Sequence, residues 1–130
     1  MQTTIESMLT RGRAVHTRTG SRPAADIPWT AHPVFAGVAL KHLVTGADTD
    51  GALSCHLVRL TPGVRLASHV HDGQWELHEV VAGSGRAGLG GVTADYLPGV
   101  AAVIPRGLVH EVTAGESGLC LYAKFFPALL

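Results

Sequence analysis

The sequence predicts an all-β barrel or sandwich. Its 130 residues include sixteen glycines and seven prolines, so turns are frequent along the chain. From Ile27 onward, short apolar segments alternate with these turn residues, which is typical of all-β barrels and sandwiches. A chain of this length has enough interior for one domain with a real core.

The N-terminal part differs from the rest of the chain. Residues Thr3 to Glu6 fit a capping box, which predicts a short helix over residues 4–10. Residues 11–26 are polar and contain glycine and proline, so they indicate a loop or an extended arm. We therefore divide the chain into an N-terminal helix and arm, residues 1–26, and a barrel domain, residues 27–130.

Nine strands are expected in the barrel domain. The breaks between them carry turn-forming residues, as in the Gly46 to Gly51 segment. The predicted strands are Val34–Val44, Leu53–Leu60, Arg65–His71, Glu76–Val81, Arg86–Leu89, Thr93–Leu97, Ala101–Ile104, Val109–Thr113 and Leu119–Phe126.

Composition excludes several classes of protein. The formal net charge is zero and no basic run occurs, so no nucleic-acid partner is expected. No apolar run approaches membrane-spanning length, and the N-terminus lacks the apolar region of a signal peptide. We therefore expect a cytoplasmic protein without a membrane partner. Cys55 and Cys120 form no C-x-x-C pair, which predicts buried thiols.

Histidines and a glutamate are spaced as in a metal site. His69 and His71 are two residues apart, so on a strand they point to the same face. Glu76 follows shortly afterwards, and His110 comes after a Pro-x-Gly turn. A carboxylate in a barrel interior is costly unless a cation or hydrogen bonds compensate it. Imidazole and carboxylate together suit one divalent ion of iron, manganese, nickel, copper or zinc.

Two longer patterns contain these residues. Residues 63–83 follow G-x5-H-x-H-x4-E-x6-G, and residues 99–110 follow G-x5-P-x-G-x2-H. These stretches resemble the two signature motifs of the cupin superfamily. A terminal asparagine of the second motif is absent, since Ala114 occupies its place, but that asparagine is not a metal ligand in the family. The resemblance implies a double-stranded β-helix, or jelly-roll, barrel with a short N-terminal helix or arm.

The resemblance also implies a ligand set. Its motifs select His69, His71, Glu76 and His110 as metal ligands. His78 shares the strand face of Glu76, so an all-histidine site stays open as an alternative, as does a catalytic role for His78 in the pocket.

Other residues are interpreted more simply. Trp75 and Gln74 are candidates for the wall of the substrate pocket. The remaining histidines are expected to be structural or solvated, and they are His16, His32, His42 and His56. The C-terminal segment from Phe125 to Leu130 is strongly apolar, which predicts a homodimer interface or packing back against the arm.

Two functions are compatible with these features. The first is a small metalloenzyme of dioxygenase, isomerase or lyase type, because a metal with exchangeable positions can bind a small-molecule substrate. The second is a non-catalytic sensor module that binds a metal or ligand. We favour the enzyme, because both motifs keep their metal residues and no helix-turn-helix segment is present.

Overall fold

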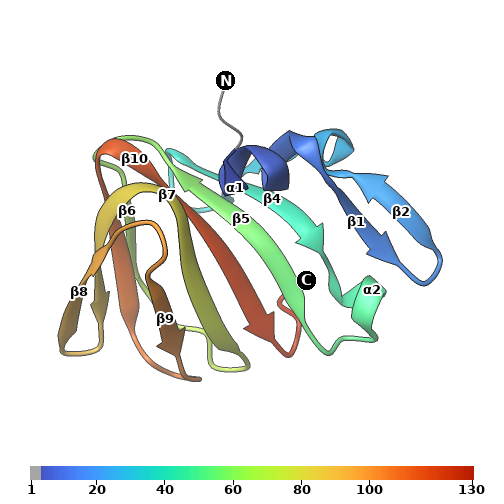
Figure 1. Ribbon diagram of the computed structural model, residues 1–130. Coiled ribbons are helices and arrows are strands. Elements are labelled where there is room, and N and C mark those ends of the chain that lie inside the picture. The colour runs from blue at the N-terminus through green and yellow to red at the C-terminus, as the bar shows by residue number, and fades with distance from the viewer. Residues whose placement is uncertain (1–3) are drawn as a thin grey trace.

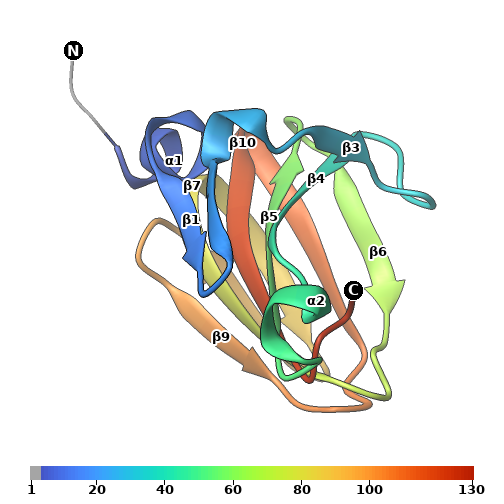
Figure 2. The ribbon, with the colours of Figure 1, turned by 90° about the vertical axis from the view of Figure 1, so that its right-hand side faces the viewer.

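The computed structural model describes residues 4–130 and consists mainly of strands that form two facing layers (Figures 1 and 2). This confirms the all-β jelly-roll prediction. The elements, in chain order, are α1 (Ile5–Ser7), a π-helical turn η1 (Met8–Gly12), β1 (Ala14–Thr17), β2 (Gly20–Pro23), a 3₁₀ turn η2 (Ala24–Asp26), β3 (Trp29–Ala31), β4 (Val38–Val44), α2 (Gly46–Thr49), β5 (Ser54–Leu60), β6 (Arg65–His69), β7 (Trp75–Leu89), β8 (Val92–Tyr96), β9 (Ala101–Ile104) and β10 (His110–Phe126).

Two long antiparallel strands, β7 and β10, run through both layers. One end of β10 pairs with β5, while the other end pairs with β6, and β7 accompanies it along both parts. The separate strands predicted at 76–81 and 86–89 are therefore one strand, as are those at 109–113 and 119–126. The register between β7 and β10 shifts between Ala114 and Leu119, where the pair bends from one layer to the other.

Glycine permits this bend. Gly83, which ends the first motif, has φ +78°, and a Cβ there would collide with the Gly118 carbonyl group. A side chain at either glycine would also strain the backbone, because Gly118 has φ +77°. Glycines that appear in the sequence as strand breaks thus let two continuous strands approach closely.

The main core lies between the two layers. It is built from alternate residues of the strands, because successive side chains point to opposite faces. Its largest buried members include Tyr96, Leu60, Leu121 and Val112.

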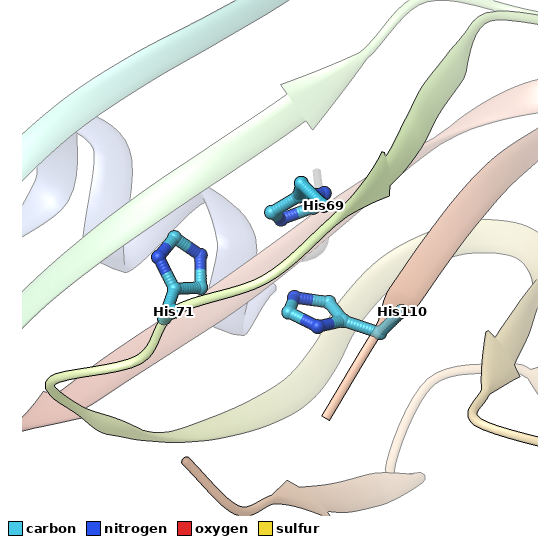
Figure 3. Close-up of side chains that lie close together, drawn as sticks. All are labelled: His69, His71 and His110. Atoms are coloured by element: carbon cyan, nitrogen blue, oxygen red, sulfur yellow. The ribbon is translucent and has the colours of Figure 1, made fainter. Parts of the chain in front are cut away.

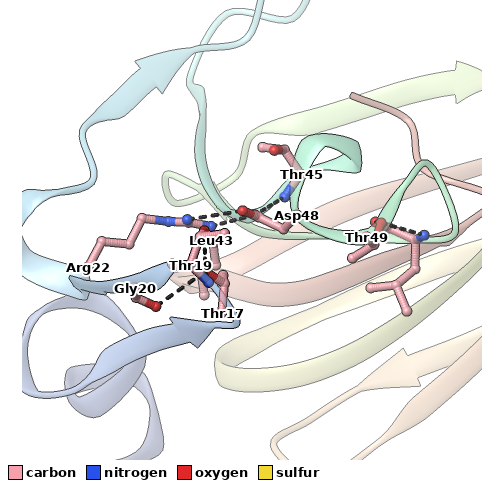
Figure 4. Close-up of polar contacts among 9 residues, drawn as sticks. Thr17, Thr19, Gly20, Arg22, Leu43, Thr45, Asp48 and Thr49 are labelled. Carbon is pink, nitrogen blue, oxygen red and sulfur yellow. Dashed lines mark hydrogen bonds and ion pairs between the residues drawn. The ribbon is translucent and has the colours of Figure 1, made fainter.

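Of the two alternatives predicted for residues 11–26, a loop or an extended arm, the structure has an arm that is mostly extended and forms a hairpin on the outside of the barrel. β1 pairs with β2, and the hairpin is tied to α2 by Arg22, whose guanidinium contacts Asp48 and donates to the Leu43 carbonyl oxygen (Figure 4). Val15 packs on a second, smaller core around Leu43, Leu57 and Cys120. The arm therefore covers its own barrel.

Short helices flank the strands. The predicted N-terminal helix is present, but Thr4 caps it with Ser7 as its partner; Thr3, expected to begin the capping box, lies outside the described residues. The turn expected after Gly46 contains the short helix α2, which Thr45 and Asp48 cap. None of the helices in residues 4–130 is long and apolar enough to cross a membrane.

The apolar C-terminal segment folds back on the barrel. The Leu129 N–H donates to Ser54 Oγ, and the Gly46 N–H donates to the Leu130 carbonyl oxygen. The segment thus packs beside β5 and α2.

Candidate metal centre

Three predicted ligands converge from two strands. His69 ends β6, His71 follows it, and His110 begins β10 directly opposite His69 in the strand register. One ligand nitrogen from each ring lies within 4.8 Å of the others, and the three rings gather around one point (Figure 3). This geometry could hold a metal ion.

Backbone contacts orient two of these rings. His69 Nδ1 lies 2.8 Å from the Ala67 carbonyl oxygen, and His110 Nδ1 lies 2.9 Å from the Leu108 carbonyl oxygen. A carbonyl oxygen only accepts hydrogen bonds, so in both rings Nδ1 carries the proton and donates it. Nε2 is then left with a free lone pair, which is the form that binds a metal.

Glu76 reaches the same point from β7. Its Oε1 lies 3.1 Å from His110 Nε2 and 3.7 Å from His71 Nε2. Among the described residues, Glu76 Oε1 and His110 Nε2 are the buried side-chain atoms that have no hydrogen-bond partner. Two unsatisfied buried polar atoms that face each other are costly, and a cation between them would satisfy both.

The protonation of His69, His71 and Glu76 also suits a metal ion. Burial lowers the pKa of His69 and of His71, which keeps both rings neutral, as metal ligation requires. Burial would also lower the pKa of His110, but the Glu76 carboxylate and the hydrogen bond to the Leu108 carbonyl oxygen together raise it. Burial would raise the pKa of Glu76, yet His78 and His110 hold it below its ordinary value. The carboxylate is therefore ionised and attracts positive charge to this point.

His78 lies behind Glu76. It is 2% exposed, its Nε2 donates to Glu76 Oε2 over 2.8 Å, and its Nδ1 accepts the Tyr96 O–H over 2.8 Å. Burial and Glu76 raise the pKa of Tyr96, so the hydroxyl stays protonated and donates. Both nitrogens of His78 are therefore occupied by hydrogen bonds, through which the ring orients the Glu76 carboxylate. His78 is not among the residues that line the pocket described next.

The group opens onto a pocket of about 410 Å³, within the usual range for small-molecule sites. His69, His71 and Glu76 form part of its wall, and most of the rest is apolar: Val34, Phe35, Leu40, Val58, Leu66, Val70, Phe125, Leu129 and Leu130. A larger, shallower groove of about 700 Å³ lies around Arg86 and Glu111 and contains none of the metal-site residues.

The residues that line this pocket differ from those expected from the sequence. The structure does not bring Trp75 or Gln74 to this pocket, and Trp75 is 43% exposed on the outer face of β7. His32, His42 and His56, expected to be solvated or structural, line it instead. The sequence contained a signal for two of them. His42 shares a strand face with Leu40, and His56 shares one with Val58, so each histidine could be expected on the apolar inner face.

Comparison with known proteins identifies the family. The model of the cupin domain matches residues 56–122, which is more than half of the chain. The chain belongs to the cupin family. No curated protein matches the sequence.

Several solved cupin-fold structures resemble this one. KdgF from Halomonas sp. is 23% identical, with a TM-score of 0.70 over 79% of this chain and 90% of that chain. A predicted oxalate decarboxylase from Thermotoga maritima is 21% identical, with a TM-score of 0.71 over 79% of this chain and 95% of that chain. An RmlC-like cupin from Shewanella frigidimarina is 18% identical, with a TM-score of 0.71 over 83% of this chain and 90% of that chain. At these identities the likeness concerns the fold alone.

Proposed function

We propose that this cupin is a metal-dependent enzyme that acts on a small organic molecule inside the barrel. The observation that carries the proposal is the group formed by His69, His71 and His110 beside the unsatisfied Glu76 Oε1, at the wall of an apolar pocket. The three imidazoles and this carboxylate are the residues that would hold the ion.

The donor set suits iron, manganese, nickel, copper or zinc. When bound, such an ion would polarise a carbonyl or hydroxyl oxygen of the substrate. Four protein ligands leave positions free on a six-coordinate ion, whereas a structural zinc site is closed and more often uses cysteine. Neither Cys55 nor Cys120 belongs to the group.

The pocket supports a particular class of substrate. Neither lysine nor arginine is among the residues that line it, and most of its wall is apolar. A compact molecule with two neighbouring oxygen atoms and no multiple negative charge therefore suits it best.

Metal analysis of the purified protein tests the ligand assignment. We expect one ion per chain in the unmodified protein and none after replacement of both His69 and His71 by alanine. The control is His16→Ala, which changes an exposed histidine of the β1–β2 hairpin and should leave the metal content unchanged. Equal metal content in the double variant would contradict the assignment.

Turnover then separates an enzyme from a sensor. We expect metal-dependent conversion of at least one compound in a panel of hydroxy acids, sugars and catechols. Tight, metal-dependent binding across the panel without any conversion would instead favour a ligand-binding sensor.

We also propose that the protein forms a homodimer and resides in the cytoplasm. An exposed apolar face on the outside of β7, β9 and β10 supports the dimer. Phe126 is the register partner of Trp75, and Val103 is the partner of Leu77. Trp75, Val103 and Phe126 are 43%, 64% and 39% exposed, respectively.

A further inference from the structure

A second pair of histidines lines the same pocket as the candidate metal centre. His42 on β4 and His56 on β5 are register partners, and both side chains belong to the pocket wall. Their Nδ1 atoms lie 2.8 Å apart, with the rings edge to face. The metal ligands do not require this pair, so its arrangement calls for a separate explanation.

One proton lies between the two rings. Burial lowers the pKa of His42, and burial together with the nearby His42 lowers the pKa of His56 to about 4. Both rings are therefore neutral at pH 7, and a contact of 2.8 Å requires one Nδ1 to donate and the other to accept. Repulsion between two bare lone pairs, or between two N–H groups, would otherwise separate them.

The chain of hydrogen bonds continues into the barrel wall. His56 Nε2 lies 2.8 Å from Ser54 Oγ, which also accepts the Leu129 N–H. If His56 Nε2–H donates to Ser54, then His56 Nδ1 accepts from His42 Nδ1–H and His42 Nε2 carries no proton. If the Ser54 O–H donates instead, the order reverses and His42 Nε2 carries a proton. His42 Nε2 thus suits both acceptance and donation of a proton.

His42 Nε2 is also placed to meet a substrate. Within residues 4–130 it has no hydrogen-bond partner, and its ring lines the pocket that the metal ligands share. His56 contacts Phe125 at 5.7 Å between ring centroids, and Phe125 contacts His71 at 5.1 Å. One aromatic ring therefore separates the histidine pair from the metal ligands, so a molecule that fills the pocket touches both groups.

We propose that His42 is the general base and acid of this enzyme, and that His56 and Ser54 position it. The reaction is then an isomerisation or an elimination of an α-hydroxy carbonyl compound. The inference rests on the proposed function and narrows it, because proton transfer of this kind belongs to isomerases and lyases and needs no oxidant.

The proton step balances within the pocket. A C–H bond next to the substrate carbonyl breaks, its proton moves to His42 Nε2, and its electron pair stays on the substrate as an enolate. The positive charge is shared with His56 through the Nδ1–H–Nδ1 bond. Return of the proton to the carbonyl carbon, together with transfer of the substrate's hydroxyl proton to the former carbonyl oxygen, gives the isomer. In the elimination, the enolate electron pair forms a new C=C bond as the bond to a β-hydroxyl group breaks, and the proton from His42 Nε2 leaves with that hydroxyl group as water.

The proposal is tested by the exchange of hydrogen for deuterium in a probe molecule dissolved in deuterated water. The probe is 2-hydroxyacetophenone, C₆H₅–CO–CH₂OH. It has a carbonyl and a hydroxyl oxygen on adjacent carbon atoms, an exchangeable C–H bond, and an apolar ring that can contact the pocket wall. The zinc-loaded full chain should accelerate exchange of its CH₂ hydrogens, measured by proton NMR. His42→Gln should slow this exchange by roughly 100-fold or more, the usual scale of acid–base catalysis, while probe affinity changes little. Ser54→Ala should slow it by a smaller factor, and the control His16→Gln should leave it unchanged.

A second measurement needs no variant. Nitrogen-15 NMR of the unmodified protein should detect a coupling between His42 Nδ1 and His56 Nδ1 through their shared proton. Addition of the probe should shift the His42 Nε2 resonance.

The possible failures are distinguishable. Zinc-dependent probe binding with no exchange, or with exchange that His42→Gln does not slow, would overturn the role of His42 and leave the metalloenzyme proposal standing. Absence of the nitrogen coupling would overturn the histidine chain. Probe binding that does not depend on zinc would count against the proposed function itself.

Discussion

Acid should destabilise this protein through one buried histidine more than through any exposed one. His56 is 2% exposed, and burial with the nearby His42 lowers its pKa from 6.5 to about 4, although Glu76 opposes the shift. In the unfolded chain the same ring takes up a proton near its ordinary pKa. Between these two values the unfolded state binds more protons than the folded state, so stability falls as pH falls.

The size of this loss follows from the two values. Each pH unit between them costs about 1.4 kcal/mol, so His56 accounts for a loss of about 3 kcal/mol between about pH 7 and about pH 4. That is a large fraction of the stability of a typical domain. Most of the loss should occur below about pH 6.5, where the unfolded ring becomes charged.

Urea unfolding of the metal-free protein at several pH values measures the effect. The free energy of unfolding of the unmodified protein should fall by about 3 kcal/mol more than that of His56→Gln over this range. His16→Gln, on the exposed hairpin, serves as the control and should follow the unmodified protein. Parallel curves for the unmodified protein and His56→Gln would show that the buried ring charges freely, which would refute the reasoning.

Two further predictions concern the metal group and the outer face. Glu76→Ala should lower metal affinity by roughly ten-fold or more. His78→Ala should lower it less, because His78 contacts Oε2 of the carboxylate and not the Oε1 that faces the other histidines. Metal titration measures the two affinities, and the reverse order would support a four-histidine site. Trp75→Lys should convert the proposed dimer to a monomer without loss of fold, since Trp75 is exposed. Sedimentation at micromolar concentration would show this, and a monomer before substitution would remove the proposal.

The convergence of His69, His71 and His110 could be predicted from the sequence because the information for it is local. His69 and His71 share a strand face through the two-residue period, and the motif spacing adds Glu76 and His110. The same local rule put His78 on the face of Glu76, but it could not show that Tyr96 and Glu76 occupy both ring nitrogens.

The pocket histidines depended on strand pairing. The contact between His42 and His56 exists because β4 and β5 pair in one particular register. A shift of one residue would turn either side chain to the opposite face. The hairpin of the arm pairs residues that are close in sequence, but its attachment to the barrel depends on Arg22, whose partner Asp48 is twenty-six residues away. Interactions between distant residues decided the features that local patterns did not predict.

The central place of β10 has a consequence for synthesis of the protein on the ribosome. β10 lies between β5 and β7 in one layer and also pairs with β6 in the other. Until residues 110–126 emerge, the edges of β5 and β6 on that side lack this partner and are open to pairing with other chains. The nascent chain should therefore depend on chaperones or on rapid synthesis until β10 is made.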